Sequence, residues 1–298
     1  MMAATTMTKE KPAAPVTRNV PWTRRLGSAR LYIGALIVLV WGLGPFYWMA
    51  VTAFRDPRYT FDNTPWPTHL TLENFRDVFD TSRGNDFGQA MVNSVIIGSI
   101  TTVIALLLGV LAAYALARLT FRGKYLVSGL ILSASMFPVV VLVTPLFQLF
   151  TDLGWIGKYQ AMIIPNISFV LPMTVYILAA FFAELPWELE EAARIDGATK
   201  LQAFRLVMLP LAAPAVFTTA ILAFIAAVNE YLLARLLSSE STKPVTVAIA
   251  GFSGNNPLVQ PYASIMAAGT LVTIPLVIMV LLFQRRIISG LTAGGVKS

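Results

Sequence analysis

The chain offers few residues that could carry out a chemical reaction. None of its 298 residues is cysteine, and the single histidine, His69, lies in a polar loop where a histidine is usually just solvated. No H-E-x-x-H sequence is present. The nearest approach to a phosphate-binding P-loop, Gly290–Ser298, fails because Val296 separates Gly295 from Lys297. We therefore predict no catalytic residue, metal ligand or bound cofactor in this chain.

Three polar residues stand out within an otherwise apolar block: Asn229, Glu230 and Arg235. Charges at membrane depth are costly, so such residues usually face a cavity, a partner or the membrane surface. Two interpretations stay open. Asn229 and Glu230 could line a polar pathway for a solute that needs hydrogen-bonding partners, or Glu230 and Arg235 could lie near the end of a helix and reach the interface.

The polar segment between Glu184 and Pro210 begins with the signals of a short helix. Pro186 suits a first helical turn, and Arg194 sits near the negatively polarised end. Acidic residues follow the proline, where they face the positively polarised helix start: Glu188, Glu190 and Glu191. Asp196 and Gly197 then predict a stop, because glycine can adopt the left-handed conformation that ends a helix.

A second helix is predicted directly after this stop. Thr199 and Gln202 have the spacing of a capping box, and Pro210 then opens the next apolar block. Three apolar residues fall on one face of this second helix: Leu201, Phe204 and Met208. A short amphipathic helix of this kind either inserts into a groove of another protein or packs beneath its own bundle.

The elements around these residues are predicted to be membrane helices. Hydrophobic residues make up 56% of the chain and charged residues 12%, well below the roughly 25% charged residues of a soluble domain. A bilayer core of about 30 Å requires about 20 apolar residues per helix. Six blocks satisfy this: Leu31–Phe54, Met91–Ala117, Tyr125–Phe150, Gln160–Phe182, Leu211–Leu236 and Ala263–Phe283.

The lysine and arginine residues outside these blocks predict the orientation. With a cytoplasmic N-terminus, fifteen fall on the inner side and seven on the outer side, as the positive-inside rule expects. The net charge of +7 therefore reflects membrane topology, and we predict no nucleic-acid partner. Residues 1–30 lack the features of a signal peptide and are expected to form a cytoplasmic tail.

The segment Glu191–Ala198, followed by Phe204 and Pro210, resembles the EAA loop of importer-type ATP-binding cassette (ABC) permeases. The similarity covers nearly the whole chain after the tail and is greatest to the MalG-type carbohydrate permeases. Further matching segments are Leu72–Phe75, Asn93-Ser94, Ala112–Ala115, Leu185–Leu189 and Gly290–Lys297. The chain departs from many relatives at Val228, where they have tryptophan before the asparagine.

The resemblance implies an all-α, six-span fold of the type I ABC importer permeases. The expected domains are the tail 1–30, a permease domain 31–288 with the EAA loop at 184–210, and a C-terminal tail 289–298. It also implies four kinds of partner: a second, MalF-type permease, two ATPase subunits that bind ATP and Mg²⁺, an extracytoplasmic sugar-binding protein and the lipid bilayer. The expected location is the bacterial cytoplasmic membrane, with both termini inside.

The resemblance also assigns roles to individual residues. The expected ATPase-coupling set is Glu190, Glu191, Ala192, Ala193, Asp196, Gly197, Phe204 and Pro210. Gly294, Gly295 and Lys297 would reach the ATPase subunits from the C-terminal tail. The expected substrate is a disaccharide such as trehalose or maltose. The alternatives are another solute such as glycerol phosphate, or a proton-coupled transporter that works without ATPase subunits.

Overall fold

The computed structural model describes residues 22–83, 85–252 and 260–293, and these residues form helices joined by turns. The chain divides into two units, Met1–Trp48 and Met49–Ser298, which are considered separately below. The described part of the first unit is residues 22–48 of the helix α1 (Trp22–Ala53). Residues 49–53 of this helix belong to the second unit. This helix begins at Trp22, earlier than the predicted Leu31, and its apolar window has no buried residue.

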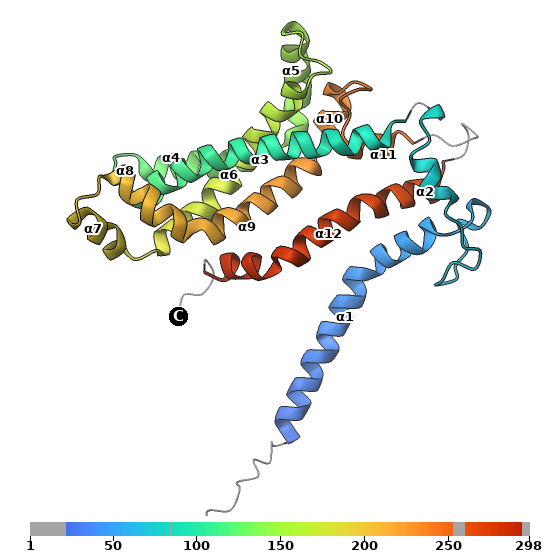
Figure 1. Cartoon of the computed structure of the whole chain (residues 1–298), viewed down its shortest axis with the longest axis horizontal. Coiled ribbons are helices and arrows are strands. Elements are labelled where there is room, and N and C mark those ends of the chain that lie inside the picture. Colours follow the sequence, from blue (N-terminus) through green and yellow to red (C-terminus); the bar gives the residue numbers. More distant parts are fainter. Residues whose placement is uncertain (1–21, 84, 253–259, 294–298) are drawn as a thin grey trace, which may run out of the picture. The chain divides into compact units, whose positions relative to one another are not determined.

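The second unit is a bundle of long helices (Figure 1). Helix α3 packs most extensively against α6 and α9, and α12 packs against α9. Small side chains allow this close packing, and Ala105, Ala223 and Ala227 are buried together with Val170. The four long helices are α3 (Phe87–Arg118), α6 (Tyr159–Glu184), α9 (Leu209–Val228) and α12 (Tyr262–Ala293).

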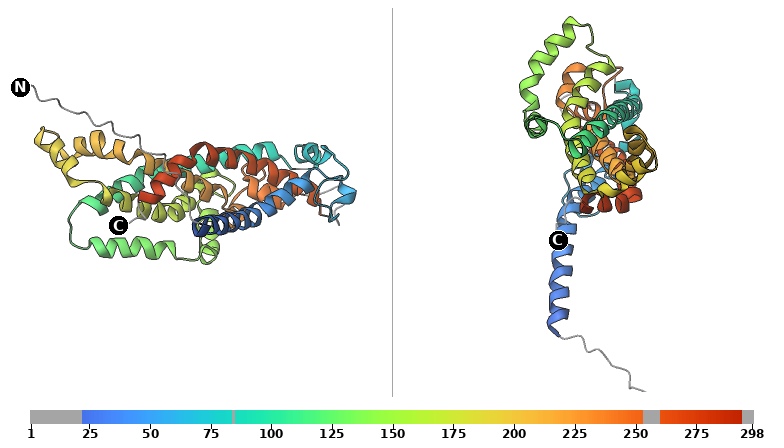
Figure 2. Two further views of the ribbon diagram at one scale, coloured as in Figure 1. Left: turned by 90° about the horizontal axis from the view of Figure 1, so that it is seen from below. Right: turned by 90° about the vertical axis from the view of Figure 1, so that its left-hand side faces the viewer.

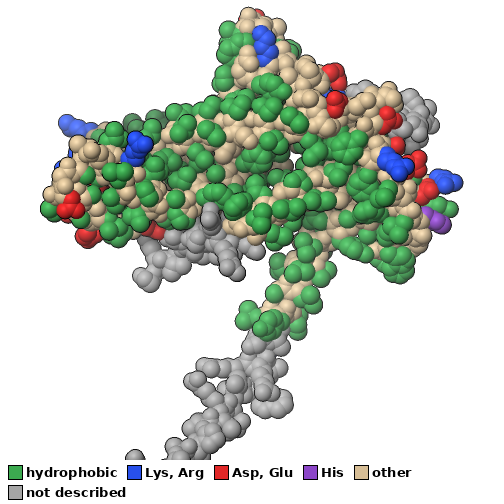
Figure 3. All heavy atoms as spheres, viewed as in Figure 1, with side chains coloured by type: hydrophobic (Ala, Val, Ile, Leu, Met, Phe, Trp, Pro, Cys, Tyr) green, Lys and Arg blue, Asp and Glu red, His purple; other side chains and the backbone are tan. Residues whose placement is uncertain are grey.

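The outer surface of the bundle is apolar, as expected for a membrane protein. On the face shown in Figure 3, hydrophobic side chains cover the middle of the bundle, and charged side chains gather mainly toward its two ends. Within the described residues, five helices are long and apolar enough to cross a membrane, or six if one bent pair forms a single span. The predicted all-α, multi-span fold is therefore confirmed.

The third predicted span, Tyr125–Phe150, is not one continuous helix, so that prediction was wrong in detail. Helices α4 (Lys124–Ser135) and α5 (Val139–Asp152) replace it and are bent by 86° relative to each other, a turn visible in Figure 2. The break falls at Pro138, which has no N–H to donate and disfavours helical geometry in the residue before it.

The fifth predicted span, Leu211–Leu236, is also interrupted, and its predicted start at Pro210 needs correction. Helix runs without interruption from Lys200 to Val228 and then stops at Asn229. Its first part is α8 (Lys200–Ala203) followed by the π-helical turn η3 (Phe204–Met208). Because the wider turn lets Leu209 N–H reach the carbonyl of Phe204, the helix passes through Pro210 without ending there.

Shorter elements lie at the two ends of the bundle. Figure 1 places α7 and α8 at its left-hand end and α2 and α11 at its right-hand end. The residue ranges of the remaining short elements are η1 (Pro57–Tyr59), α2 (Glu73–Val78), η2 (Thr81–Arg83), α7 (Trp187–Ile195), α10 (Leu232–Leu237) and α11 (Val245–Ala250).

The loop after α1 has its own polar framework. The Asn74 amide donates hydrogen bonds to the carbonyls of Ala53 (2.8 Å) and Arg55 (2.6 Å). Nearby, hydrogen bonds from Arg58 to the Asp56 carboxylate hold the pKa of Asp56 below its usual value. The ring of His69 stacks on Tyr59 at 4.2 Å between ring centroids.

Candidate functional site

Helix α7 forms and ends where the sequence signals predicted. Pro186 is its N-cap, and Glu188 and Glu190 lie in its first turn. At the other end Gly197 has φ +93°, Ala198 N–H bonds to Ala193 O at 3.0 Å, and Gly197 N–H bonds to Arg194 O at 3.1 Å. These two bonds constitute a Schellman motif, which satisfies carbonyls that would otherwise lack partners. The predicted helix stop at Gly197 is confirmed.

The helix that follows begins with the predicted capping box. Thr199 Oγ1 accepts from Gln202 N–H, and the Gln202 side chain accepts from Thr199 N–H at 2.8 Å. The predicted apolar face of this helix is divided, however. Phe204 and Met208 are buried in the bundle, whereas Leu201 is 71% exposed.

Helix α7 has one face against the bundle and one face open. The buried face carries Glu190, whose carboxylate accepts a hydrogen bond from the hydroxyl of Tyr114 on α3 at 2.8 Å. The open face carries Glu191 and Ala192, and it continues to Ile195, which is 85% exposed. One side of α7 therefore packs beneath its own bundle, and the opposite side is exposed.

A second contact from α3 holds the start of the loop. The guanidinium of Arg118 donates to the carbonyl of Leu185 and lies over the Trp187 ring, 4.6 Å from its centroid. The ring of Tyr114 also packs against Phe204 at 4.5 Å between centroids. The loop that contains α7 is therefore fixed to the end of α3 by hydrogen bonds, a cation–π contact and aromatic packing.

The sequence did not identify Tyr114 or Arg118 as part of this site. Tyr114 lies in one of the segments that carried the family resemblance, and Arg118 was counted only as a topology signal. The available clue was a tyrosine and an arginine spaced four residues apart at the end of an apolar helix, which places both on one face.

The predicted coupling residues separate into inward and outward positions. Glu190 and Phe204 are buried against the chain's own bundle, and Ala193 is half-buried. The remaining members are exposed: Glu191, Ala192, Asp196, Gly197 and Pro210. The predicted tail residues Gly294, Gly295 and Lys297 lie outside the described residues.

At the opposite end of the bundle, Glu230 caps a helix. Its two carboxylate oxygens accept from the backbone N–H groups of Leu233 (2.8 Å) and Ala234 (2.9 Å) at the start of α10. Asn229 is exposed at the end of α9. Glu230 also borders an enclosed space of about 10 Å³, which is no larger than one water molecule.

A larger polar hollow, which the sequence did not reveal, lies beside this turn. Its volume is about 320 Å³, and the residues around it include Asn85, Arg235, Ser239, Glu240 and Lys243. Arg235 therefore borders a polar hollow. The sequence left open a solute pathway lined by Asn229 and Glu230, or an interfacial position for Glu230 and Arg235. The edge of this hollow is a third position.

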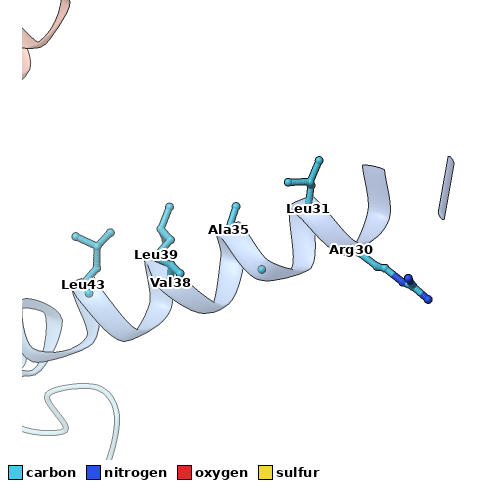
Figure 4. Close-up of a pocket in the computed structure, with 8 residues that line it drawn as sticks. Arg30, Leu31, Ala35, Val38, Leu39 and Leu43 are labelled. Carbon is cyan, nitrogen blue, oxygen red and sulfur yellow. The ribbon is translucent and has the colours of Figure 1, made fainter. Parts of the chain in front are cut away.

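A further hollow, of about 990 Å³, follows α1 alone. Figure 4 shows Arg30, Leu31, Ala35, Val38 and Leu43 along it, all from this one helix. It is an apolar face of a single helix and offers no convergent polar groups. Among the described residues, no group of three or more His, Cys, Asp or Glu could hold a metal ion.

Apolar membrane-length helices around a small-residue core, with a short helix fixed beneath one end, define a polytopic membrane protein. Residues 78–292 match the family described as binding-protein-dependent transport system inner membrane component, and the chain belongs to this family. It is similar to a solved bacterial ABC transporter that imports alginate, with a TM-score of 0.71 at 21% identity over 90% of this chain and 99% of the other. The fold is thus that of ABC importer permeases.

Two relatives are more similar in sequence. The trehalose transport system permease protein SugB of Mycobacterium tuberculosis is 45% identical over 88% of this chain and 94% of the relative. The trehalose/maltose transport system permease protein MalG of Thermococcus litoralis is 43% identical over 90% of this chain and 96% of the relative.

Proposed function

We propose that this chain is a permease subunit of an ATP-driven importer for a disaccharide of the trehalose or maltose kind. The observation that supports it most is the helix–glycine–helix loop, which is fixed beneath a bundle with the ABC importer permease fold. The choice of sugar rests on the two relatives named for trehalose and for trehalose/maltose transport.

In this proposal the exposed face of α7 docks into an ATPase subunit. Glu191, Ala192, Asp196 and Gly197 would form the contact, while Glu190 and Phe204 would hold the helix in place from the inner side. Pro210 would contribute by shaping the helix that continues from the loop into the bundle. Gly294, Gly295 and Lys297 are proposed to reach the ATPase subunits from the C-terminal tail.

The proposed orientation places α7 in the cytoplasm together with both termini. This orientation is supported by contacts between segments that were predicted to lie on the same side of the membrane. On the predicted inner side, Arg118 contacts Leu185 and Trp187. Segments predicted to be outside also meet, since the carbonyl of Gly157 accepts a hydrogen bond from the hydroxyl of Thr242 at 3.0 Å. The proposed boundaries remain a tail to residue 30, a permease domain to residue 288 and a second tail from 289.

The chain itself would catalyse no reaction and bind no cofactor. ATP and Mg²⁺ would be bound by two ATPase subunits, and the pathway would form between this chain and a second permease of the MalF type. A sugar-binding protein would deliver the substrate to the outer end. One solved structure with the same fold, an alginate transporter at 17% identity and a TM-score of 0.67, contains such a periplasmic protein. Asn229 and Glu230 would line part of the pathway at that end.

Reconstitution of the complex purified through a tag on this chain tests the proposal. We expect an ATPase, a second permease and a binding protein to be associated with it, and ATP-dependent uptake of labelled trehalose or maltose into vesicles. The panel of solutes should include glycerol phosphate. Uptake of only that solute would contradict the sugar assignment, and uptake by this chain alone under a proton gradient would contradict the importer assignment.

A further inference from the structure

Helix α3 differs from the other membrane-length helices because it contains no proline. Each of the others in the described part of the chain, the bent α4–α5 pair included, has at least one proline within it or at its break. A proline removes a backbone hydrogen bond and bends the helix, so its absence makes α3 the stiffest of these spans. The helix extends without interruption from Phe87 to Arg118.

Helix α3 is also packed closely along its length. A Cβ atom added at Gly98 would lie 2.8 Å from Val228 on α9, and one added at Gly109 would lie 2.6 Å from Thr174 on α6. Both distances are shorter than real carbon contacts, so the backbone approaches its neighbours as closely as glycine permits. Such packing resists deformation of α3 and couples its movement to that of α9 and α6.

One end of α3 holds the loop that contains α7. The Tyr114 hydroxyl donates to the buried Glu190 carboxylate, and Arg118 contacts the backbone before α7 and the ring of Trp187. Because Glu190 is on the side of α7 opposite the exposed residues, a force on the exposed face reaches α3 through this contact.

The other end of α3 holds a polar loop. Asn93 is fully buried, and its amide donates to the carbonyls of Ser241 and Lys243, both at 3.0 Å. Its side-chain oxygen accepts from the Tyr159 hydroxyl at 2.7 Å. The next residue, Ser94, accepts from Val245 N–H at 2.8 Å. Residues 239–243 of this loop are called the polar loop below, and three of them, Ser239, Glu240 and Lys243, border the 320 Å³ hollow.

We propose that α3 is the rigid element that carries movement of α7 to the polar loop, with Tyr114 and Asn93 as its positioning residues. The interval from Asn93 to Tyr114 corresponds to about 30 Å of helix at 1.5 Å per residue, which matches a bilayer core. The inference rests on the proposed function, because it needs an ATPase that moves α7. To the proposed function it adds α3 as the helix that transmits this movement and the polar loop as the segment that receives it.

The absence of cysteine from the chain allows a direct test of transmission. A single cysteine at Ser241 is exposed and retains the backbone carbonyl that Asn93 contacts. A control cysteine at Phe61 is exposed in a loop that Asn93 does not contact. In the purified complex in nanodiscs, we expect ATP to change the thiol-labelling rate at position 241 and to leave that at position 61 unchanged.

Tyr114→Phe is the informative variant, because it removes the hydroxyl and keeps the ring that packs against Phe204. It should reduce the ATP-dependent change in labelling at position 241 by about tenfold, a factor near the upper end for a neutral hydrogen bond and the lower end for one to a charged group. Glu190→Gln keeps an acceptor oxygen and should retain most of the change. Tyr125→Phe, at an 89% exposed tyrosine on α4, should retain all of it.

The alternative is that Tyr114 only stabilises the loop. It predicts less assembled complex in Tyr114→Phe, with a wild-type ATP-dependent change in what remains, and that result overturns the inference. An unmodified complex that contains no ATPase overturns the proposed function, and with it this inference. A reduction of about tenfold in Tyr114→Phe, together with retention in Glu190→Gln and Tyr125→Phe, supports the inference.

Discussion

Gly197→Val should uncouple transport from ATP hydrolysis while leaving membrane insertion intact. Gly197 has φ +93°, and a Cβ added there would meet nothing within 4 Å, so the cost of a side chain is backbone strain alone. Left-handed geometry costs about 1–2 kcal/mol for a residue with a Cβ, and a β-branched residue tolerates it poorly. This energy shifts a local equilibrium by about 5–30-fold, which is enough to move α7 away from its native orientation.

Gly123 provides a matched control for this substitution. It has φ +89°, a Cβ there would also meet nothing within 4 Å, and it lies between α3 and α4 on the same predicted side of the membrane. Gly123→Val should therefore cost a similar strain energy and, like Gly197→Val, leave membrane insertion intact. It should leave α7 in place, because Gly123 belongs to a different loop.

The assay is sugar-stimulated ATP hydrolysis by the purified complex, normalised to the amount of assembled subunits. We expect Gly197→Val to lower the stimulation by about 5–30-fold, from the strain energy given above, and Gly123→Val to leave it near wild type. Gly197→Asn should give an intermediate value, because asparagine adopts left-handed geometry more readily than valine. Equal stimulation in the two valine variants would refute the reasoning that the orientation of α7 transmits the coupling.

Three further predictions concern charge and sidedness. A cysteine at Glu73 should be labelled from outside intact cells and one at Lys200 should not, since both positions are exposed and the basic residues predict opposite sides; the reverse pattern would invert the topology. Glu191→Lys should weaken retention of the ATPase subunits, whereas Glu184→Lys, exposed at the end of α6, should not; equal retention would contradict docking through α7. Glu230→Gln keeps one acceptor oxygen, so it should weaken the cap of α10 by less than the about 0.5–2 kcal/mol lost with a whole capping side chain. It should change transport rate or sugar preference with assembly retained. Unchanged transport in both this variant and Asn229→Ala would limit the pair to a structural role.

The features that were predicted correctly from the sequence are those that short segments determine. Apolar blocks long enough to span a bilayer must become helices there, because the lipid offers no partner for an unpaired backbone group. The end of α7 at Gly197 and the capping box at Thr199 were also predictable, since each depends on residues within one helical turn.

The interruptions within spans were visible in the sequence only as possibilities. Pro138 was one of several prolines inside the apolar blocks, and proline within membrane helices often causes only a kink. At Pro145 the helix continues, whereas at Pro138 it breaks into two segments 86° apart. Which outcome occurs depends on whether neighbouring groups can satisfy the freed carbonyls, and this is a property of the packed bundle. The end of α9 before Glu230 likewise depends on a side chain that bonds forward to α10.

The sequence by itself determined that this is a multi-span membrane protein with a polar helix–turn–helix loop, because apolar runs, caps and a left-handed glycine act locally. Only the tertiary structure decided which face of α7 is free, because Glu190 meets Tyr114 across 76 positions of the chain and its neighbour Glu191 does not. The same holds for Asn93 and the polar loop, 148 and 150 positions apart. Helical periodicity fixes which residues share a face, whereas the packing of α3 against the rest of the bundle fixes what that face touches.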